Sequence, residues 1–162
     1  MERQNVPYPY LDTPSLLIDL DKLEANIKDM QQAANEAGVK LRPHTKVHES
    51  AVIAKMQLDA GACGIEVGPI DQVEPMAESG ITDILVAHPF YGEHKFENLR
   101  RVLSRWPKLK LSIVVDMIEQ AEGISRVAQE VGRKVPSLIK LDTGVDRYGV
   151  LPGEPTLNLA KK

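Results

Sequence analysis

The sequence predicts an α/β fold with a parallel sheet, because strand-like and helix-like segments alternate along most of its 162 residues. The runs ILVA (84–87), LSIVV (111–115) and SLIKL (137–141) carry nearly continuous hydrophobic side chains, as strands covered by helices do. The segments between these runs show the apolar spacing that is typical of helices. We therefore expect a series of β–α units.

The first twenty residues are expected to form an arm and a strand ahead of these units. Residues 1–13 are polar and rich in proline, and Ser15–Leu20 is a branched apolar run that predicts a strand. Apolar residues then recur at helical spacing. We expect this helix to have Asp21 as its N-cap and to stop at Gly38.

About five parallel strands are expected after this helix, each followed by a helix. The strands are expected at Lys40–Lys46, Ala62–Gly68, Thr82–Phe90, Leu109–Met117 and Pro136–Gly144, although Pro43 argues against continuous pairing of the first. The helices are expected at 48–61, 71–80, 93–106, 118–134 and 156–162. Because a full (β/α)₈ barrel needs roughly 250 residues, residues 21–162 are expected to form either a smaller open sheet or an incomplete barrel domain.

Composition and charge exclude several classes of function. The formal net charge of −3 has the wrong sign for a protein that binds nucleic acid electrostatically. No apolar run approaches the ~20 residues of a membrane span, and the polar N-terminus does not resemble a signal peptide. Cys63 is the single cysteine, and its apolar neighbours predict a buried, inert thiol. These features favour a cytoplasmic protein with neither nucleic acid nor membrane as a partner.

Lys46 is the first candidate for a catalytic side chain. It ends the expected strand at Lys40–Lys46, and catalytic residues in parallel α/β folds gather at the carboxyl ends of strands. Apolar walls would desolvate the amine and lower its pKa, and a neutral amine can attack an aldehyde. The residues alone leave open the commoner case of a solvated surface lysine.

Three histidines lie near the carboxyl end of the expected sheet, where Lys46 is also expected. We call this end of the sheet the rim. His44 and His48 flank Lys46 at two residues on either side, so a strand would direct all three side chains to one face. His88 ends the run ILVAH (84–88) within the expected strand at Thr82–Phe90 and could stack on a ligand or donate a hydrogen bond to it. The pair His44 and His48 lacks the acidic and cysteine partners of a zinc site, so no metal site is predicted.

The segment IKLDTGVDRYGV (139–150) is an apolar strand that runs into a polar turn containing two glycines. Arg147 follows the strand, so its guanidinium could reach the same rim as Lys46 and bind a phenolate or phosphate oxygen. An ordinary turn with a surface arginine is the alternative. The sequence contains no GxGxxG motif after a strand and no GxxxxGK[ST] motif, so it gives no support to nucleotide binding.

Taken in order, TPSLLIDLDKLEANI (13–27), LRPHTKVH (41–48) and IKLDTGVDRYGV (139–150) resemble the N-terminal part of the alanine-racemase-like, fold type III pyridoxal-phosphate enzymes. RPHTK-x-H is similar to the D-threonine aldolase and D-serine dehydratase branch. The resemblance implies a partial (β/α)₈ TIM barrel. It also implies that Lys46 holds pyridoxal 5'-phosphate as an internal aldimine and that Arg147 contacts a ring oxygen of the cofactor.

Two further features follow from the resemblance. Lys140 has the spacing from Arg147 of a lysine that is carbamylated in some racemases, but we interpret it as an unmodified ion partner of Arg147. Glu49 stands after His48 where many aldolase-like members carry a lysine, which leaves the subfamily open. A divalent metal is compatible with the aldolases and dehydratases, whose metal ligands would lie beyond Lys162.

The implied function is a pyridoxal-phosphate-dependent lyase that acts at Cα of a D-3-hydroxy amino acid. Lys46 or His44 would move the proton, and Lys46, Arg147 and His88 would bind the cofactor. The alternatives are a non-catalytic pyridoxal-phosphate-binding protein, an amino acid racemase, and an inert half-barrel. A half-barrel exposes unpaired strand edges, so we expect self-association, for example as a homodimer.

Overall fold

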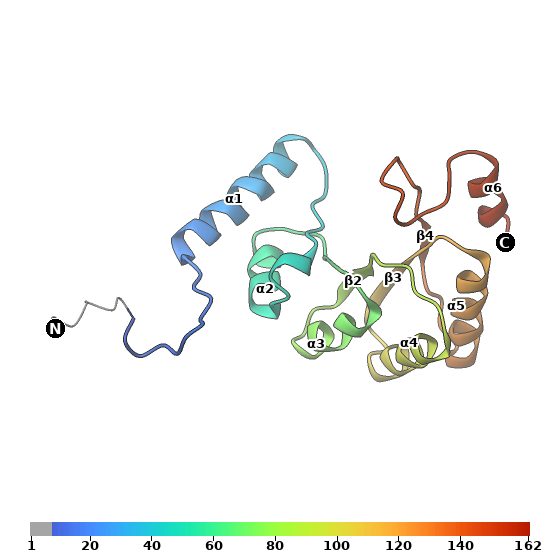
Figure 1. Cartoon of the computed structure of the whole chain (residues 1–162), viewed down its shortest axis with the longest axis horizontal. Helices are drawn as coiled ribbons and strands as arrows, with labels where there is room; N and C mark the ends of the chain where they lie inside the picture. Colours follow the sequence, from blue (N-terminus) through green and yellow to red (C-terminus); the bar gives the residue numbers. More distant parts are fainter. Residues whose placement is uncertain (1–7) are drawn as a thin grey trace.

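The computed structural model describes residues 8–162 as six helices, four strands and two short 3₁₀ turns (Figure 1). The helices are α1 (Leu20–Glu36), α2 (Ala51–Asp59), α3 (Val73–Glu78), α4 (Glu93–Arg105), α5 (Ile118–Val131) and α6 (Glu154–Ala160). The strands are β1 (Ile65–Val67), β2 (Asp83–Val86), β3 (Lys110–Val115) and β4 (Ser137–Ile139), and the turns are η1 (Thr45–Val47) and η2 (Ile70–Gln72). All strand pairs are parallel and the sheet order is β1-β2-β3-β4.

One face of the sheet forms the hydrophobic core with the helices. Ile65 lies beside Ile84, and Val67 beside Val86, in the parallel register, and all four side chains are fully buried. Side chains alternate across a strand, so these residues share the face against which α3, α4 and α5 gather in Figure 1. Burial of each such side chain stabilises the fold by about 1.5–3 kcal/mol.

The opposite face of the sheet is less covered. Glu66, Leu85 and Ser112 form one register row on this face and are half-buried, whereas Leu138 on β4 is 48% exposed. In a closed barrel the corresponding face lines the interior and is filled by side chains from the other strands.

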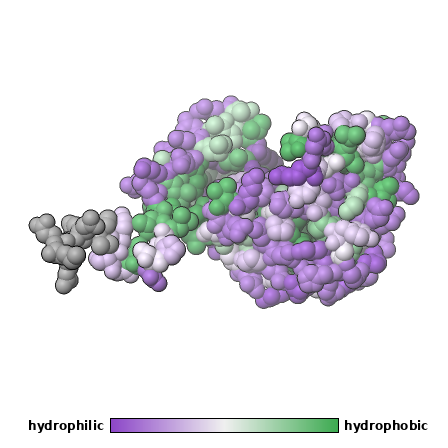
Figure 2. All heavy atoms as spheres, viewed as in Figure 1, coloured by the Kyte–Doolittle hydropathy of each residue, from purple (hydrophilic) through white to green (hydrophobic). Residues whose placement is uncertain are grey.

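The expected strand at Ser15–Leu20 is not formed. No strand is assigned in residues 8–20 of the structure, because an apolar run becomes a strand only where another strand accepts its hydrogen bonds. Leu16, Leu17 and Ile18 are exposed instead, and Figure 2 shows an apolar patch at this end of the described chain. The part of the predicted arm in residues 1–7 lies outside the described residues.

Helix α1 starts slightly earlier than expected. Asp19 is its N-cap and its carboxylate accepts a hydrogen bond from the Lys22 amide at 3.2 Å, so Asp21 is already inside the first turn. Gly38 follows the last turn with a φ of 66°, the left-handed conformation that glycine adopts at little cost.

The expected strand at Lys40–Lys46 is also wrong, which reduces the sheet from five strands to four. A single parallel bridge joins His44 to Glu66, and the chain then enters the turn η1. Pro43 has no amide hydrogen, so the segment cannot pair continuously as a strand. Cys63, expected to be buried, is exposed in the turn that precedes β1.

Helices α4 and α5 meet at a contact that requires glycine. A Cβ atom at Gly123 would lie 2.1 Å from Cζ of Phe96. Phe96 is itself buried and lies edge-on against Phe90 and Tyr91, so its ring has little room to move away. The absence of a side chain at Gly123 therefore sets the separation of the two helices.

Replacing Gly123 by alanine is expected to lower the free energy of unfolding by about 1–3 kcal/mol, as overpacking of a core does. The overlap with Phe96 outweighs the gain of about 1 kcal/mol that alanine usually brings to a helix interior. Urea unfolding measures the difference. Ser125→Ala, on the exposed side of the same helix, is the control and should change stability by less than about 0.5 kcal/mol. Equal stability of the two variants would contradict the prediction.

Candidate active site

The segment that carries Lys46 is fastened to β1 by hydrogen bonds. The Glu66 amide donates to the Pro43 carbonyl at 2.8 Å, and the Thr45 hydroxyl donates to the Glu66 carbonyl at 3.2 Å. Thr45 is fully buried. The Lys46 amide donates to Nδ1 of His44 at 3.2 Å, which closes the turn. These contacts place Lys46 at the carboxyl end of the sheet.

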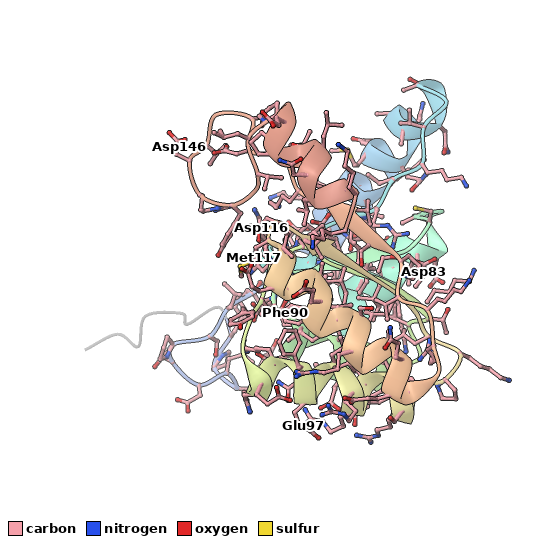
Figure 3. All side chains as sticks on the ribbon, turned by 90° about the vertical axis from the view of Figure 1, so that its right-hand side faces the viewer. Asp83, Phe90, Glu97, Asp116, Met117 and Asp146 are labelled. Carbon is pink, nitrogen blue, oxygen red and sulfur yellow. The ribbon has the colours of Figure 1, made fainter. Side chains whose placement is uncertain are left out.

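At the other end of the strands, Arg42 locks the same segment to the sheet. Its guanidinium donates to the Ile65 carbonyl at 3.3 Å and forms an ion pair with Asp83 at 2.8 Å. A Cβ atom at Gly64 would lie 2.2 Å from the Arg42 guanidinium, so glycine leaves the space that this ion pair occupies. Asp83 and Asp116 lie at opposite ends of the sheet in Figure 3.

Aromatic rings and a guanidinium form a continuous row along the rim. The His44 and His88 rings are 6.2 Å apart between centroids, and the His88 and Tyr148 rings are 5.6 Å apart with an interplanar angle of 33°. Arg147 lies over the Tyr148 ring at 5.1 Å. Gly68 leaves the space for His88, because a Cβ atom there would lie 2.9 Å from Cε1 of the imidazole.

Residues 141–150, which carry Arg147 and Tyr148, form a closed loop after β4. The Asp142 carboxylate accepts hydrogen bonds from the amides of Gly144, Val145 and Asp146 at 3.0, 3.0 and 3.3 Å. These amides lower the pKa of Asp142, with the Gly144 amide contributing most. A cleft of about 250 Å³ lies between Lys140 and this loop.

Burial and nearby positive charges favour the neutral form of the two histidines at the rim, His44 and His88. Burial lowers the pKa of His88, and the charges of Arg147, Lys140 and Lys46 lower it further while Glu66 opposes them. Burial also lowers the pKa of His44, where Glu66 acts in the opposite direction and Lys46 adds to the lowering. The rim is therefore suited to an anionic ligand.

The hydrogen bond to His44 assigns its tautomer. Nδ1 accepts from the Lys46 amide, so the proton of the neutral imidazole resides on Nε2. His44 can therefore donate a hydrogen bond from Nε2. Its Nδ1 lone pair is already engaged by the backbone.

The structure brings Lys46, His44, His88 and Arg147 to one rim, as the sequence predicts. Lys46 is exposed, which is the solvated alternative that the residues left open, and Arg147 is exposed as well. One detail of the prediction is wrong. His48 does not share a face with His44, because η1 is a turn and not a strand; Nδ1 of His48 accepts from the Ser50 amide at 3.0 Å, and burial lowers its pKa.

The predicted ion pair between Lys140 and Arg147 is wrong as well. Both side chains are cations when unmodified, so they repel each other. Lys140 Nζ instead donates to the Ala87 carbonyl at 3.4 Å. Among residues 8–162, no three metal-ligating His, Cys, Asp or Glu side chains gather at one place.

Sequence reasoning did not single out Tyr148, Gly68 or Asp116. Asp116 directly follows β3, so the rule that identified His88 at the end of β2 could have identified it too. Tyr148 adjoins Arg147 within the motif that was recognised. The role of Gly68 depends on the position of the His88 ring and has no local signal in the sequence.

The sequence matches the family model of the alanine racemase N-terminal domain over residues 18–162. The chain belongs to this family. D-threo-3-hydroxyaspartate dehydratase from Delftia sp. (strain HT23) is 37% identical over 150 residues, which are 93% of this chain and 39% of the relative. D-threonine aldolase from Arthrobacter sp. is 35% identical over 156 residues, which are 96% of this chain and 40% of the relative.

Solved structures agree with this assignment. The crystal structure of D-threonine aldolase from Filomicrobium marinum has a TM-score of 0.88 at 32% identity, and the match covers 93% of this chain and 40% of that one. The chain thus spans about 40% of the length of the relatives it matches. The expected α/β class is confirmed, and the four parallel strands of this family member correspond to part of the predicted TIM barrel. No helix within residues 8–162 is long and apolar enough to cross a membrane.

The three lowered histidine pKa values predict that the chain loses stability when the pH falls below about 6.5. The unfolded chain binds these protons more readily than the folded one. The free energy of unfolding therefore decreases as the pH falls from the histidine pKa of the unfolded chain to the lower values of the folded chain. Above that window the contribution of the neutral histidines is fully present. Urea unfolding between about pH 7.5 and pH 5 measures the slope.

Carboxylates with lowered pKa values add to this slope only near its acid end. The ordinary pKa values of Asp71, Glu74 and Asp142 are 3.8, 4.5 and 3.8, so in the unfolded chain these groups take up few protons above pH 5. His88→Gln should reduce the slope, whereas His94→Gln, on the exposed side of α4, is the control. A slope that His88→Gln leaves unchanged would refute the assignment to His88.

Proposed function

We propose that the chain is the N-terminal barrel part of a pyridoxal-phosphate-dependent lyase of D-3-hydroxy amino acids, of the aldolase or dehydratase type. The observation that carries the proposal is the position of Lys46 at the same rim as His44, His88 and Arg147. The names of the relatives support the reaction class, since threonine and 3-hydroxyaspartate both carry a hydroxyl group on Cβ.

The residues of the rim fit this cofactor. Lys46 offers an amine for the aldehyde, and Lys140 and Arg147 offer cationic donors for anionic oxygens. The His88 and Tyr148 rings, tilted by 33° to each other, give aromatic surface against which another aromatic ring can pack. When bound, pyridoxal phosphate supplies an electron sink for the charge that develops at Cα of an amino acid.

Each side chain has a distinct role in this proposal. Lys46 is the covalent attachment point and, once free, its Nζ moves the proton at the substrate. His44 donates a hydrogen bond from Nε2 in its neutral form, because its Nδ1 accepts from the Lys46 amide; it would give up a proton only from its charged form. Arg147 binds an oxygen of the cofactor ring, and His88 packs against the ring beside Tyr148.

The proposal extends to the setting of the protein. We place residues 21–162 in one barrel domain that acts on a small D-amino acid in the cytoplasm. A divalent metal, if one takes part, would use ligands outside this chain. The outer edge of β4 favours self-association, because an unpaired strand edge attracts other strands. Light scattering would detect such a dimer.

The chain is expected to bind pyridoxal phosphate covalently and reversibly at Lys46. Mixing the two should produce absorbance in the near-visible range, and borohydride reduction followed by peptide mass spectrometry should locate the cofactor on Lys46. Lys46→Ala should lose at least ~90% of the absorbance, because it removes the nucleophilic amine.

Lys55→Ala is the matched control, since Lys55 is an exposed lysine on the neighbouring helix α2 and should leave binding unchanged. Covalent labelling of other lysines with Lys46 unmodified would refute the proposal. Cofactor binding at Lys46 without turnover of D-threonine or D-3-hydroxyaspartate, measured with a divalent metal present, would favour the alternative of a non-catalytic binding protein.

A further inference from the structure

The loop formed by residues 141–150 is attached to the sheet at two places. Its neck is tied to β4, where the Val150 amide donates to the Lys140 carbonyl and the Asp142 amide donates to the Val150 carbonyl, both at 2.9 Å. A neck of two hydrogen bonds fixes the ends of the loop. It does not by itself set the angle at which the loop stands over the rim.

The second attachment reaches across to β3. The Gly149 amide donates a hydrogen bond of 3.0 Å to Oδ2 of Asp116. Gly149 has a φ of 109°, and a Cβ atom there would lie 2.6 Å from the Leu141 carbonyl carbon and the Asp142 nitrogen. The close packing of Gly149 on the neck therefore fixes the position from which its amide reaches Asp116.

The backbone of Asp116 is held by a hydrogen bond to a buried side chain of α5. Gln120 on α5 is fully buried, its Nε2 donates to the Val114 carbonyl at 3.0 Å, and its Oε1 accepts from the Asp116 amide at 3.2 Å. Figure 3 shows Asp116 beneath the loop that carries Asp146. A chain of contacts thus runs from the core of α5 through Asp116 to the loop.

We propose that Asp116 is a positioning residue, whose carboxylate holds the loop so that Arg147 and Tyr148 face His88. The purpose of this positioning, which is to present Arg147 to the cofactor, rests on the proposed function. The proposal goes beyond that function because Asp116 is not among the residues assigned to the cofactor or the proton, and its side-chain hydrogen bond runs to the Gly149 amide. Asp116 acts through the Gly149 amide alone.

A purely structural role for Asp116 makes a different prediction. If Asp116 merely stabilised the fold, its loss would lower stability without moving Arg147 relative to His88. If it positions the loop, its loss separates Arg147 from His88, and the pKa of His88 rises toward 6.5. Lys140, Lys46 and Glu66 also act on His88, but none of them lies on the loop.

His44 provides an internal reference in the same molecule. The charges that act on His44 come from Glu66, Lys46, His88 and Lys140, and Arg147 is not among its main influences. Release of the loop should therefore change the pKa of His88 much more than the pKa of His44.

The experiment is an NMR pH titration of the histidine rings in the 162-residue chain without cofactor, combined with amide hydrogen exchange. In Asp116→Ala we expect the pKa of His88 to rise and the Gly149 amide to exchange at least about tenfold faster, because it loses a charge-assisted acceptor. Asp116→Asn should restore both values, since an amide oxygen can accept the same hydrogen bond.

Controls separate the positioning role from general effects. Glu119→Ala removes an exposed carboxylate from the start of α5 and should change neither value. In an Arg147→Ala background, Asp116→Ala should raise the pKa of His88 by less than it does with Arg147 present, because the charge is already gone and only the burial that Tyr148 provides is lost. If Asp116→Ala does not fold, Asp116→Ser replaces it, since its hydroxyl is too short to reach Gly149.

An unchanged His88 pKa in a folded Asp116→Ala or Asp116→Ser variant would overturn the proposal. So would an Asp116→Asn variant that behaves like Asp116→Ala. Failure of the unaltered chain to bind pyridoxal phosphate would count against the proposed function only, because the titration needs no cofactor.

Discussion

Residues 41–45 run beside β1, and their attachment decides where Lys46 lies. Three hydrogen bonds, from the Cys63 amide to Leu41, from the Glu66 amide to Pro43 and from the Thr45 hydroxyl to Glu66, replace the regular pairing of a strand. Each contributes about 1 kcal/mol net, and a buried partner left unpaired would cost about 1–3 kcal/mol. The site therefore depends on a short segment held by these hydrogen bonds and not on a fifth strand.

The parallel register adds the second condition for the site. Because every strand runs in the same direction, the segments after β2, β3 and β4 all emerge at the rim where Lys46 lies. His88, Asp116 and Arg147 thereby become neighbours although they are far apart in the sequence. Cations gather there around imidazoles that burial keeps neutral, which leaves the rim with positive charge for an anionic ligand.

The sequence predicts those parts of the fold that depend on local pattern. Apolar runs bounded by turns identify β1 to β4, and helical spacing identifies α1 to α5. Ser15–Leu20 has the composition of a strand, and Lys40–Lys46 has the place of one in the β–α alternation. A strand exists only where a partner accepts its hydrogen bonds, and that information is not local. Candidate site residues at strand ends were predictable because local pattern identifies where the strands end. The direction of the His48 side chain was not, because it depends on the turn that replaces the expected strand.

The two sides of the molecule are held by different forces. The helix-covered side is stabilised by buried aliphatic and aromatic side chains, with close contacts such as Gly123 against Phe96. The rim is held by side chains that bond to backbone amides, as Asp142 and Asp116 do in the loop after β4. Hydrophobic burial is non-directional, but hydrogen bonds fix orientation. Changes on the helical side should therefore alter stability first, and changes at the rim should alter the relative positions of Lys46, His88 and Arg147 first.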